Sequence, residues 1–121
     1  MEVRVVNLND KFNAFADHWS PKIVGELNGQ QVKLARFSGE FVSHKHDNED
    51  EMFLVVEGTL LMELNDGTLT INPGEFVIIP RGTTHKPVAV GEVKVMLFEP
   101  ISTLNTGDAT SSLTTTKLDR I

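Results

Sequence analysis

The chain has 121 residues, of which 40% are hydrophobic, and its formal net charge is −6. This length and composition fit one globular domain with a core of its own. With 17 acidic residues against 11 Lys and Arg, the chain lacks the basic excess that binding to a nucleic-acid backbone requires. It contains no cysteine, which excludes disulfides, thiolate metal sites and cysteine nucleophiles.

No targeting or membrane-spanning segment is recognisable in the sequence. The start, MEVRVVNLNDKF, lacks the continuous apolar stretch of a signal peptide. No run approaches the roughly 20 apolar residues that cross a bilayer. We therefore expect a cytoplasmic protein that binds neither membranes nor nucleic acid.

The first predicted elements are a short strand and a short helix. Residues 3–6 form a β-rich run that a polar stretch interrupts. Asp10 can cap a short helix that continues through Phe15. Pro21 closes this segment, because the residue before a proline is pushed out of helical geometry.

From there the chain is predicted to form hairpins. Asn28-Gly29 and Asp66-Gly67 are dipeptides that favour tight hairpin turns, and each is flanked by two apolar runs. Many short strands at spacings of about ten residues are typical of an all-β sandwich or jelly roll. The predicted strands cover residues 23–27, 32–37, 60–64, 69–71, 76–79 and 93–98.

The composition changes near residue 101. Residues 102–121 are rich in Ser and Thr and show no sustained period. We predict one β-barrel domain over residues 1–101, followed by this tail. The tail can be a surface arm, or Leu104, Leu113 and Leu118 can pin it across the barrel or a partner subunit.

Four residues have a spacing that suits a metal site. His44 and His46 alternate, so in a strand they project to the same side. Glu51 follows after enough residues for a turn, and His85 follows a later strand. A histidine pair alone is a weak signal. Three imidazoles and a carboxylate together suit a divalent first-row metal with positions left open for water or substrate.

Two stretches resemble the paired sequence motifs of the cupin family. The first is Gly39-x4-His44-x-His46-x4-Glu51-x6-Gly58, which has one residue fewer after its first glycine than G-x5-H-x-H-x3,4-E-x6-G. The second is Gly74-x5-Pro80-x-Gly82-x2-His85, which resembles G-x5-P-x-G-x2-H-x3-N except that Ala89 replaces the asparagine. Within the family, the chain is similar to small single-domain bacterial cupins labelled mannose-6-phosphate-isomerase-like.

The resemblance implies an all-β cupin jelly roll, a double-stranded β-helix barrel, with a short N-terminal helix and an extended C-terminal tail. It implies that His44, His46, Glu51 and His85 bind one divalent transition-metal ion, which can be Fe, Mn, Ni, Co, Cu or Zn. Asp50 is the competing carboxylate, because the family motif permits three or four residues between the second histidine and the carboxylate. Glu51 is favoured by its distance from the next motif glycine and because Asp50 would lie on the opposite strand face.

The function implied is that of a small metal-dependent enzyme acting on a polar or anionic small molecule. Isomerase, dioxygenase and decarboxylase chemistry are all compatible, and no catalytic residue is identified. The alternative is a non-catalytic cupin that binds or senses a small molecule, with a structural metal. Arg36 could bind an anionic group of a substrate if its face of the strand pointed into the barrel. The resemblance also implies a homodimer.

Overall fold

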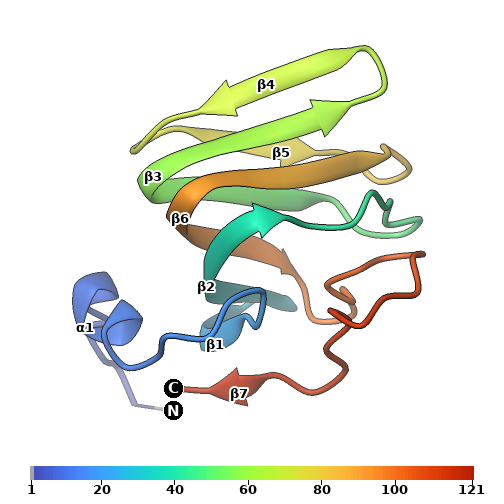
Figure 1. Cartoon of the computed structure of the whole chain (residues 1–121). Coiled ribbons are helices and arrows are strands. Elements are labelled where there is room, and N and C mark those ends of the chain that lie inside the picture. The colour runs from blue at the N-terminus through green and yellow to red at the C-terminus, as the bar shows by residue number, and fades with distance from the viewer. Residues whose placement is uncertain (1) are drawn as a thin grey trace.

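The computed structural model describes residues 2–121 and shows a curled β-sheet with one short helix (Figure 1). The strands follow the order β4-β3-β6-β2-β1-β7, and β5 also pairs with β3. This architecture confirms the predicted all-β jelly roll with a short N-terminal helix. The elements are α1 (Leu8–Phe12), β1 (Lys22–Leu27), β2 (Gln30–Glu40), β3 (Glu51–Leu64), β4 (Gly67–Ile71), β5 (Phe76–Ile79), β6 (His85–Pro100) and β7 (Asp119–Arg120).

The two long strands β3 and β6 pair along most of their lengths, and both bend. The register shifts on both sides of Glu57. Gly58 has a φ of +87°, and a Cβ atom there would lie 2.7 Å from the carbonyl oxygen of Glu92. Glycine is therefore required where β3 bends. The predicted strands 60–64 and 93–98 are parts of these longer strands, because the glycines at the bends were interpreted as strand boundaries.

Both predicted hairpins form, and one turn differs by a residue. Asn28 and Gly29 join β1 to β2 with φ values of 52° and 78°, as their sequence predicts. Between β3 and β4, Leu64 pairs with Gly67. The second turn is therefore Asn65-Asp66, and Gly67 is the first residue of β4.

The N-terminal helix is shorter and starts earlier than predicted. The side chain of Asn7 accepts a hydrogen bond from the backbone N–H of Asp10 at 2.9 Å, so Asn7 is the cap and Asp10 lies in the first turn. The helix ends at Phe12. Residues 3–6, which were predicted to be a strand, are assigned to no strand. Within residues 2–121, no helix is long and apolar enough to span a membrane.

The interior of the barrel has two chemically different ends. At the aromatic end, Trp19 stacks on Phe37 and Phe41, with ring centroids 4.2 and 4.6 Å apart, and Phe53 meets Phe37 edge-on at 6.5 Å. Burial of such side chains contributes roughly 1.5–3 kcal/mol each to folding. The polar end consists of the buried side chains Lys33, His44, His46, Glu51, His85 and Glu99.

The C-terminal segment, residues 102–121, packs against the barrel. It leaves β6, loops back and returns beside β1 as β7 (Figure 1). Thr106 is fully buried, and Leu113 packs against the hydrophobic core. The backbone N–H of Asp108 donates a hydrogen bond to the carbonyl of Lys45 at 3.0 Å. Of the two predicted placements, the structure shows the pinned one for Leu113, whereas Leu104 is exposed. The predicted domain boundary stays a prediction.

Candidate metal centre

The backbone brings the two motif regions together. His44 lies in the loop between β2 and β3, and its backbone forms two hydrogen bonds with His85, the first residue of β6, of 3.0 and 2.8 Å. The backbone N–H of Gly82 donates to the carbonyl of His46 at 2.7 Å. Glu51 begins β3. Segments distant in the sequence therefore place four side chains at one end of the barrel.

These four side chains form a compact buried group, the His/Glu cluster. One ligand atom from each of His44, His46, Glu51 and His85 lies within 4.8 Å of the others, and all four residues are buried. Glu51 Oε1 lies 3.3 Å from His46 Nε2 and 3.5 Å from His85 Nε2. The sequence prediction named the same four residues, and the structure brings them together.

Two imidazoles are oriented by the backbone. His44 Nδ1 lies 2.8 Å from the carbonyl oxygen of Val42, and His85 Nδ1 lies 2.9 Å from that of Thr83. A carbonyl only accepts, so each Nδ1 carries the proton. The lone pair is then on Nε2, which is how metal-binding histidines are commonly held by a second hydrogen bond.

The donor atoms fit a divalent metal. His46 Nε2, Glu51 Oε1 and His85 Nε2 are buried without a hydrogen-bond partner. Leaving a polar atom buried and unpartnered costs about 1–3 kcal/mol, so a cation that bound these three atoms together would remove that cost. Imidazole nitrogens with one carboxylate oxygen are a donor set that Fe, Mn, Ni, Co, Cu and Zn accept.

The protonation states also suit a metal site. Burial lowers the pKa of His44 to about 4, so its imidazole is neutral at neutral pH. Burial by itself would raise the pKa of Glu51, but the neighbouring imidazoles of His46 and His85 and the carboxyl group of Glu99 outweigh it and hold that pKa below its ordinary value. Neutral imidazole and ionised carboxylate are the forms that bind metals.

Asp50, the competing carboxylate, is directed away from the cluster. It accepts hydrogen bonds from the backbone N–H and the Nε of Arg81, at 2.9 and 3.2 Å, on the exposed surface. The Arg81 side chain, through this hydrogen bond, holds the pKa of Asp50 below its ordinary value. Glu51 is therefore the carboxylate that the structure brings to the histidines.

Arg36, the candidate for binding a substrate anion, lies outside the barrel interior. Its guanidinium donates to the carbonyl of Phe12 at 2.8 Å and to Glu92 at 2.5 Å. The neighbouring Phe37 lines the cavity beside the cluster. Successive strand residues point to opposite faces, so Arg36 points away from the barrel interior and cannot contact a substrate there.

The sequence reasoning missed a buried pair next to the cluster. Lys33 Nζ donates to Glu99 Oε1 at 2.7 Å, and both residues are buried. Burial and the charge of Glu51 raise the pKa of Glu99 well above its ordinary value. The alternation along the strands could have indicated this burial. Lys33 lies on the same face of β2 as the buried Phe37, and Glu99 lies on the same face of β6 as the buried Leu97.

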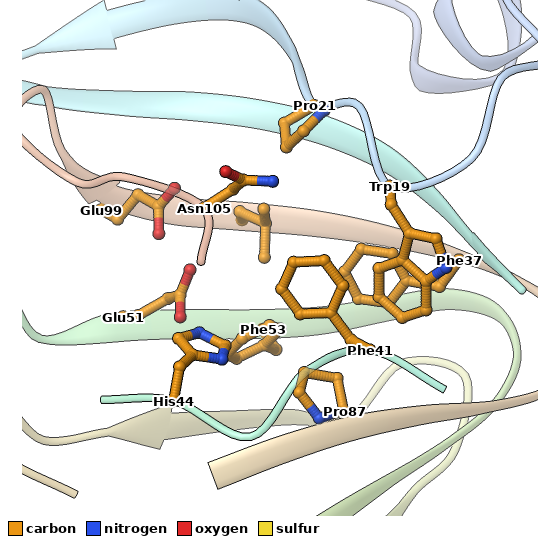
Figure 2. Close-up of a pocket in the computed structure, with 11 residues that line it drawn as sticks. Trp19, Pro21, Phe37, Phe41, His44, Glu51, Phe53, Pro87, Glu99 and Asn105 are labelled. Carbon is orange, nitrogen blue, oxygen red and sulfur yellow. The ribbon is translucent and has the colours of Figure 1, made fainter. Parts of the chain in front are cut away.

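A small cavity opens beside the cluster (Figure 2). Its volume is about 20 Å³. Figure 2 shows the carboxyl groups of Glu51 and Glu99 facing each other on one side of it, and the ring of Trp19 on the other. Only a water-sized group fits there, because one water needs about 10–15 Å³.

Known proteins share this fold. A cupin-2 domain-containing protein from Shewanella frigidimarina is 48% identical, with a TM-score of 0.78 over 79% of this chain and 94% of that chain. Protein NMB1881 from Neisseria meningitidis is 28% identical, with a TM-score of 0.74 over 80% of this chain and 99% of that one.

Sequence matches agree with the structural ones. The uncharacterised protein YdbB from Bacillus subtilis is 39% identical over 64 residues, which are 52% of this chain and 57% of YdbB. The chain spans about half the length of the curated relatives it matches. The sequence profile of the cupin domain matches residues 30–101, which is more than half of the chain. On this match and on its fold, the chain belongs to the cupin family.

Proposed function

We propose that the protein is a metal-dependent cupin enzyme that acts on a small polar or anionic molecule. The His/Glu cluster would hold one divalent ion of Fe, Mn, Ni, Co, Cu or Zn. The observation that carries the proposal is the convergence of three buried atoms without a hydrogen-bond partner: His46 Nε2, Glu51 Oε1 and His85 Nε2. A cation that accepts their lone pairs removes the cost of leaving them unpartnered.

The residues of the site would have distinct roles. A bound divalent metal supplies a Lewis acid that polarises a substrate oxygen. The carbonyls of Val42 and Thr83 keep the Nε2 atoms of His44 and His85 in place. The aromatic end excludes water from one side of the cavity. Isomerase, dioxygenase and decarboxylase chemistry fit such a site, and the mannose-6-phosphate-isomerase-like label stays a prediction.

The second candidate function is a non-catalytic cupin that binds or senses a small molecule. The size of the cavity beside the cluster, about 20 Å³, favours it, because a catalytic site must admit a reacting group of the substrate. In that case the metal would stabilise the barrel. Turnover that depends on added metal separates the enzyme from this alternative. A cytoplasmic location stays a prediction from the sequence.

We also propose a homodimer, formed through the outer face of the sheet. Apolar side chains lie side by side there across four strands, in the rows Phe76–Leu54–Met96 and Ile78–Met52–Phe98–Val32. Phe76 and Ile78 are 58% and 54% exposed. An aligned apolar face of this kind is typical of a surface that another protein covers, and a second copy of the chain is the proposed occupant.

Elemental analysis tests the metal proposal. The protein is purified without chelator, and wild type, His46→Ala and His18→Ala are compared. His18 is the matched control, since it is partly exposed and pairs with Glu92 at 2.7 Å, away from the cluster. We expect about one metal ion per chain in wild type and in His18→Ala, and a large loss in His46→Ala. Near-zero metal in all three proteins would refute the proposal.

A further inference from the structure

The backbone that carries the first two histidines of the cluster is held from two sides. In an extended segment, the N–H and C=O groups of successive residues point to opposite sides. On one side, His44 forms two backbone hydrogen bonds with His85, of 3.0 and 2.8 Å, and the carbonyl of His46 accepts one from Gly82 at 2.7 Å. The N–H and C=O groups of Lys45, which lies between the two histidines, therefore point to the other side.

Asp108 of the C-terminal segment hydrogen-bonds to both of these groups. Its Oδ1 accepts a hydrogen bond from the backbone N–H of Lys45 at 2.9 Å, and its own backbone N–H donates to the carbonyl of Lys45 at 3.0 Å. Residues 44–46 thus lie between the start of β6 and a part of the chain 63 residues further along. Without the Asp108 side chain, the N–H of Lys45 would lose this acceptor.

The C-terminal segment also passes close to His44 at Gly107. Gly107 has a φ of +55°, and a Cβ atom there would overlap the carbonyl oxygen of Lys45 and lie 2.9 Å from Cδ2 of the His44 ring. Only glycine allows the chain to pass this close. Asn105 lines the small cavity beside the cluster (Figure 2). The segment therefore forms part of the wall around the cluster.

Side-chain hydrogen bonds hold the C-terminal segment in this place. Asn105 donates through Nδ2 to the carbonyl of Leu113 and accepts through Oδ1 from the backbone N–H of Thr115, both at 2.9 Å. The hydroxyls of Thr106 and Thr114 lie 2.7 Å apart, and Thr106 is fully buried. Because the segment is fixed in this way, it can hold a neighbouring loop in one position.

We propose that Asp108 is a positioning residue of the metal centre. It fixes the backbone of Lys45 and thereby the directions in which His44 and His46 project toward Glu51. Partners that orient metal ligands from outside are commonly important for metal affinity. This role rests on the proposed function, because the directions of the two imidazoles matter only if the cluster binds a metal.

Zn²⁺ binding to the metal-free full chain, measured by competition with a chelating dye, tests this role. Asp108→Ala removes the acceptor for the Lys45 N–H, whereas Asp108→Asn keeps an acceptor oxygen and removes the charge. We expect Asp108→Ala to bind Zn²⁺ about 3- to 10-fold more weakly than wild type, as loss of one hydrogen bond predicts, and Asp108→Asn to bind like wild type. Equal affinity of Asp108→Ala and wild type, or an equal loss in both variants, would overturn the proposal.

Glu75→Ala is the matched control. Glu75 is exposed like Asp108, and its Oε1 accepts a hydrogen bond from the backbone N–H of Asn72 at 2.8 Å, in the turn before β5. This variant loses a hydrogen bond of the same kind and should keep the wild-type affinity for Zn²⁺. A loss as large as that in Asp108→Ala would show a general effect on the fold and would also overturn the proposal.

Amide hydrogen exchange of the metal-free protein tests the contact itself. We expect the amide of Lys45 to exchange faster in Asp108→Ala than in wild type, and the amides of β4 to be unchanged. Unchanged exchange at Lys45 would overturn the proposal. Failure of the proposed function gives a different result, since wild type would then take up no Zn²⁺, which would refute the metal centre and the role of Asp108 with it. Zn²⁺ uptake that is equal in wild type and Asp108→Ala would refute the role of Asp108 alone.

Discussion

The aromatic end and the polar end of the barrel interior lie on the same strands, yet they differ in how their side chains are satisfied. At the aromatic end, Phe37 and Phe53 are buried and contact other rings. At the polar end, His85 and Glu51 are equally buried, but each keeps an atom without a partner. The aromatic side chains therefore stabilise the fold by packing, whereas the polar side chains keep buried atoms that a metal ion could bind.

Breaking the aromatic end is expected to have the largest effect on stability. Phe37→Ala removes a ring that stacks on Trp19 at 4.2 Å and is only 4% exposed. We expect the free energy of unfolding to fall by about 3–5 kcal/mol, measured by urea denaturation. Leu69→Ala, at a 45% exposed position, is the control and should change little. A small change in Phe37→Ala would contradict the role given to this end.

The buried ion pair tests the polar end. Lys33→Met leaves Glu99 buried without its partner. We therefore expect the free energy of unfolding to fall by an amount at the lower end of about 3–5 kcal/mol. The lower end applies because burial and the charge of Glu51 already raise the pKa of Glu99, which can therefore take up a proton.

The double variant Lys33→Met/Glu99→Gln removes both charges and is the control for this pair. Urea denaturation should show that it recovers most of the loss, because no unpaired charge remains. A double variant that is no more stable than Lys33→Met would contradict this account, because removing the unpaired charge would then have had no effect.

In metal-free protein, His44 should make the free energy of unfolding depend on pH, and this effect should be smaller than those of the two preceding changes. Burial lowers the pKa of His44 from its ordinary value of 6.5 to about 4, so the unfolded chain binds more protons between these values. The free energy of unfolding should therefore fall as the pH is lowered from about 6.5 to about 4. His44→Gln lacks the titrating group and should fall less over the same range. The free energies are measured by urea denaturation. An equal fall in wild type and in His44→Gln over this pH range would contradict the role given to His44.

A change on the outer face should affect association and leave both interior ends intact. Ile78→Lys places a charge on the proposed dimer surface at a 54% exposed position. We expect light scattering to show a dimer for wild type and a monomer for this variant. Leu69→Lys, on β4, is the matched control and should remain a dimer. A wild-type monomer would refute the dimer proposal.

Much of the site was predictable because it depends on spacing within local segments. His44 and His46 alternate, and Glu51 and His85 begin strands that the motifs anticipate. Strand lengths were less predictable, because Gly58 continues β3 through a bend where its sequence suggests an end.

The path of the C-terminal segment could not be predicted from local pattern. The segment returns to β1 and pairs with it as β7, which a Ser- and Thr-rich sequence does not specify. Lys33 and Glu99 are 66 residues apart and meet only because β2 and β6 are neighbours in the sheet. Their burial was indicated by strand parity, but their pairing required the topology.

The measurement that tests the central claim most directly is an anomalous difference map, from a crystal of protein purified without chelator, at the absorption edge of the metal found by elemental analysis. The account predicts one strong peak between His44, His46, Glu51 and His85. A map with no peak at the cluster, or with the metal bound only at the exposed acidic loop 47–50, would contradict it.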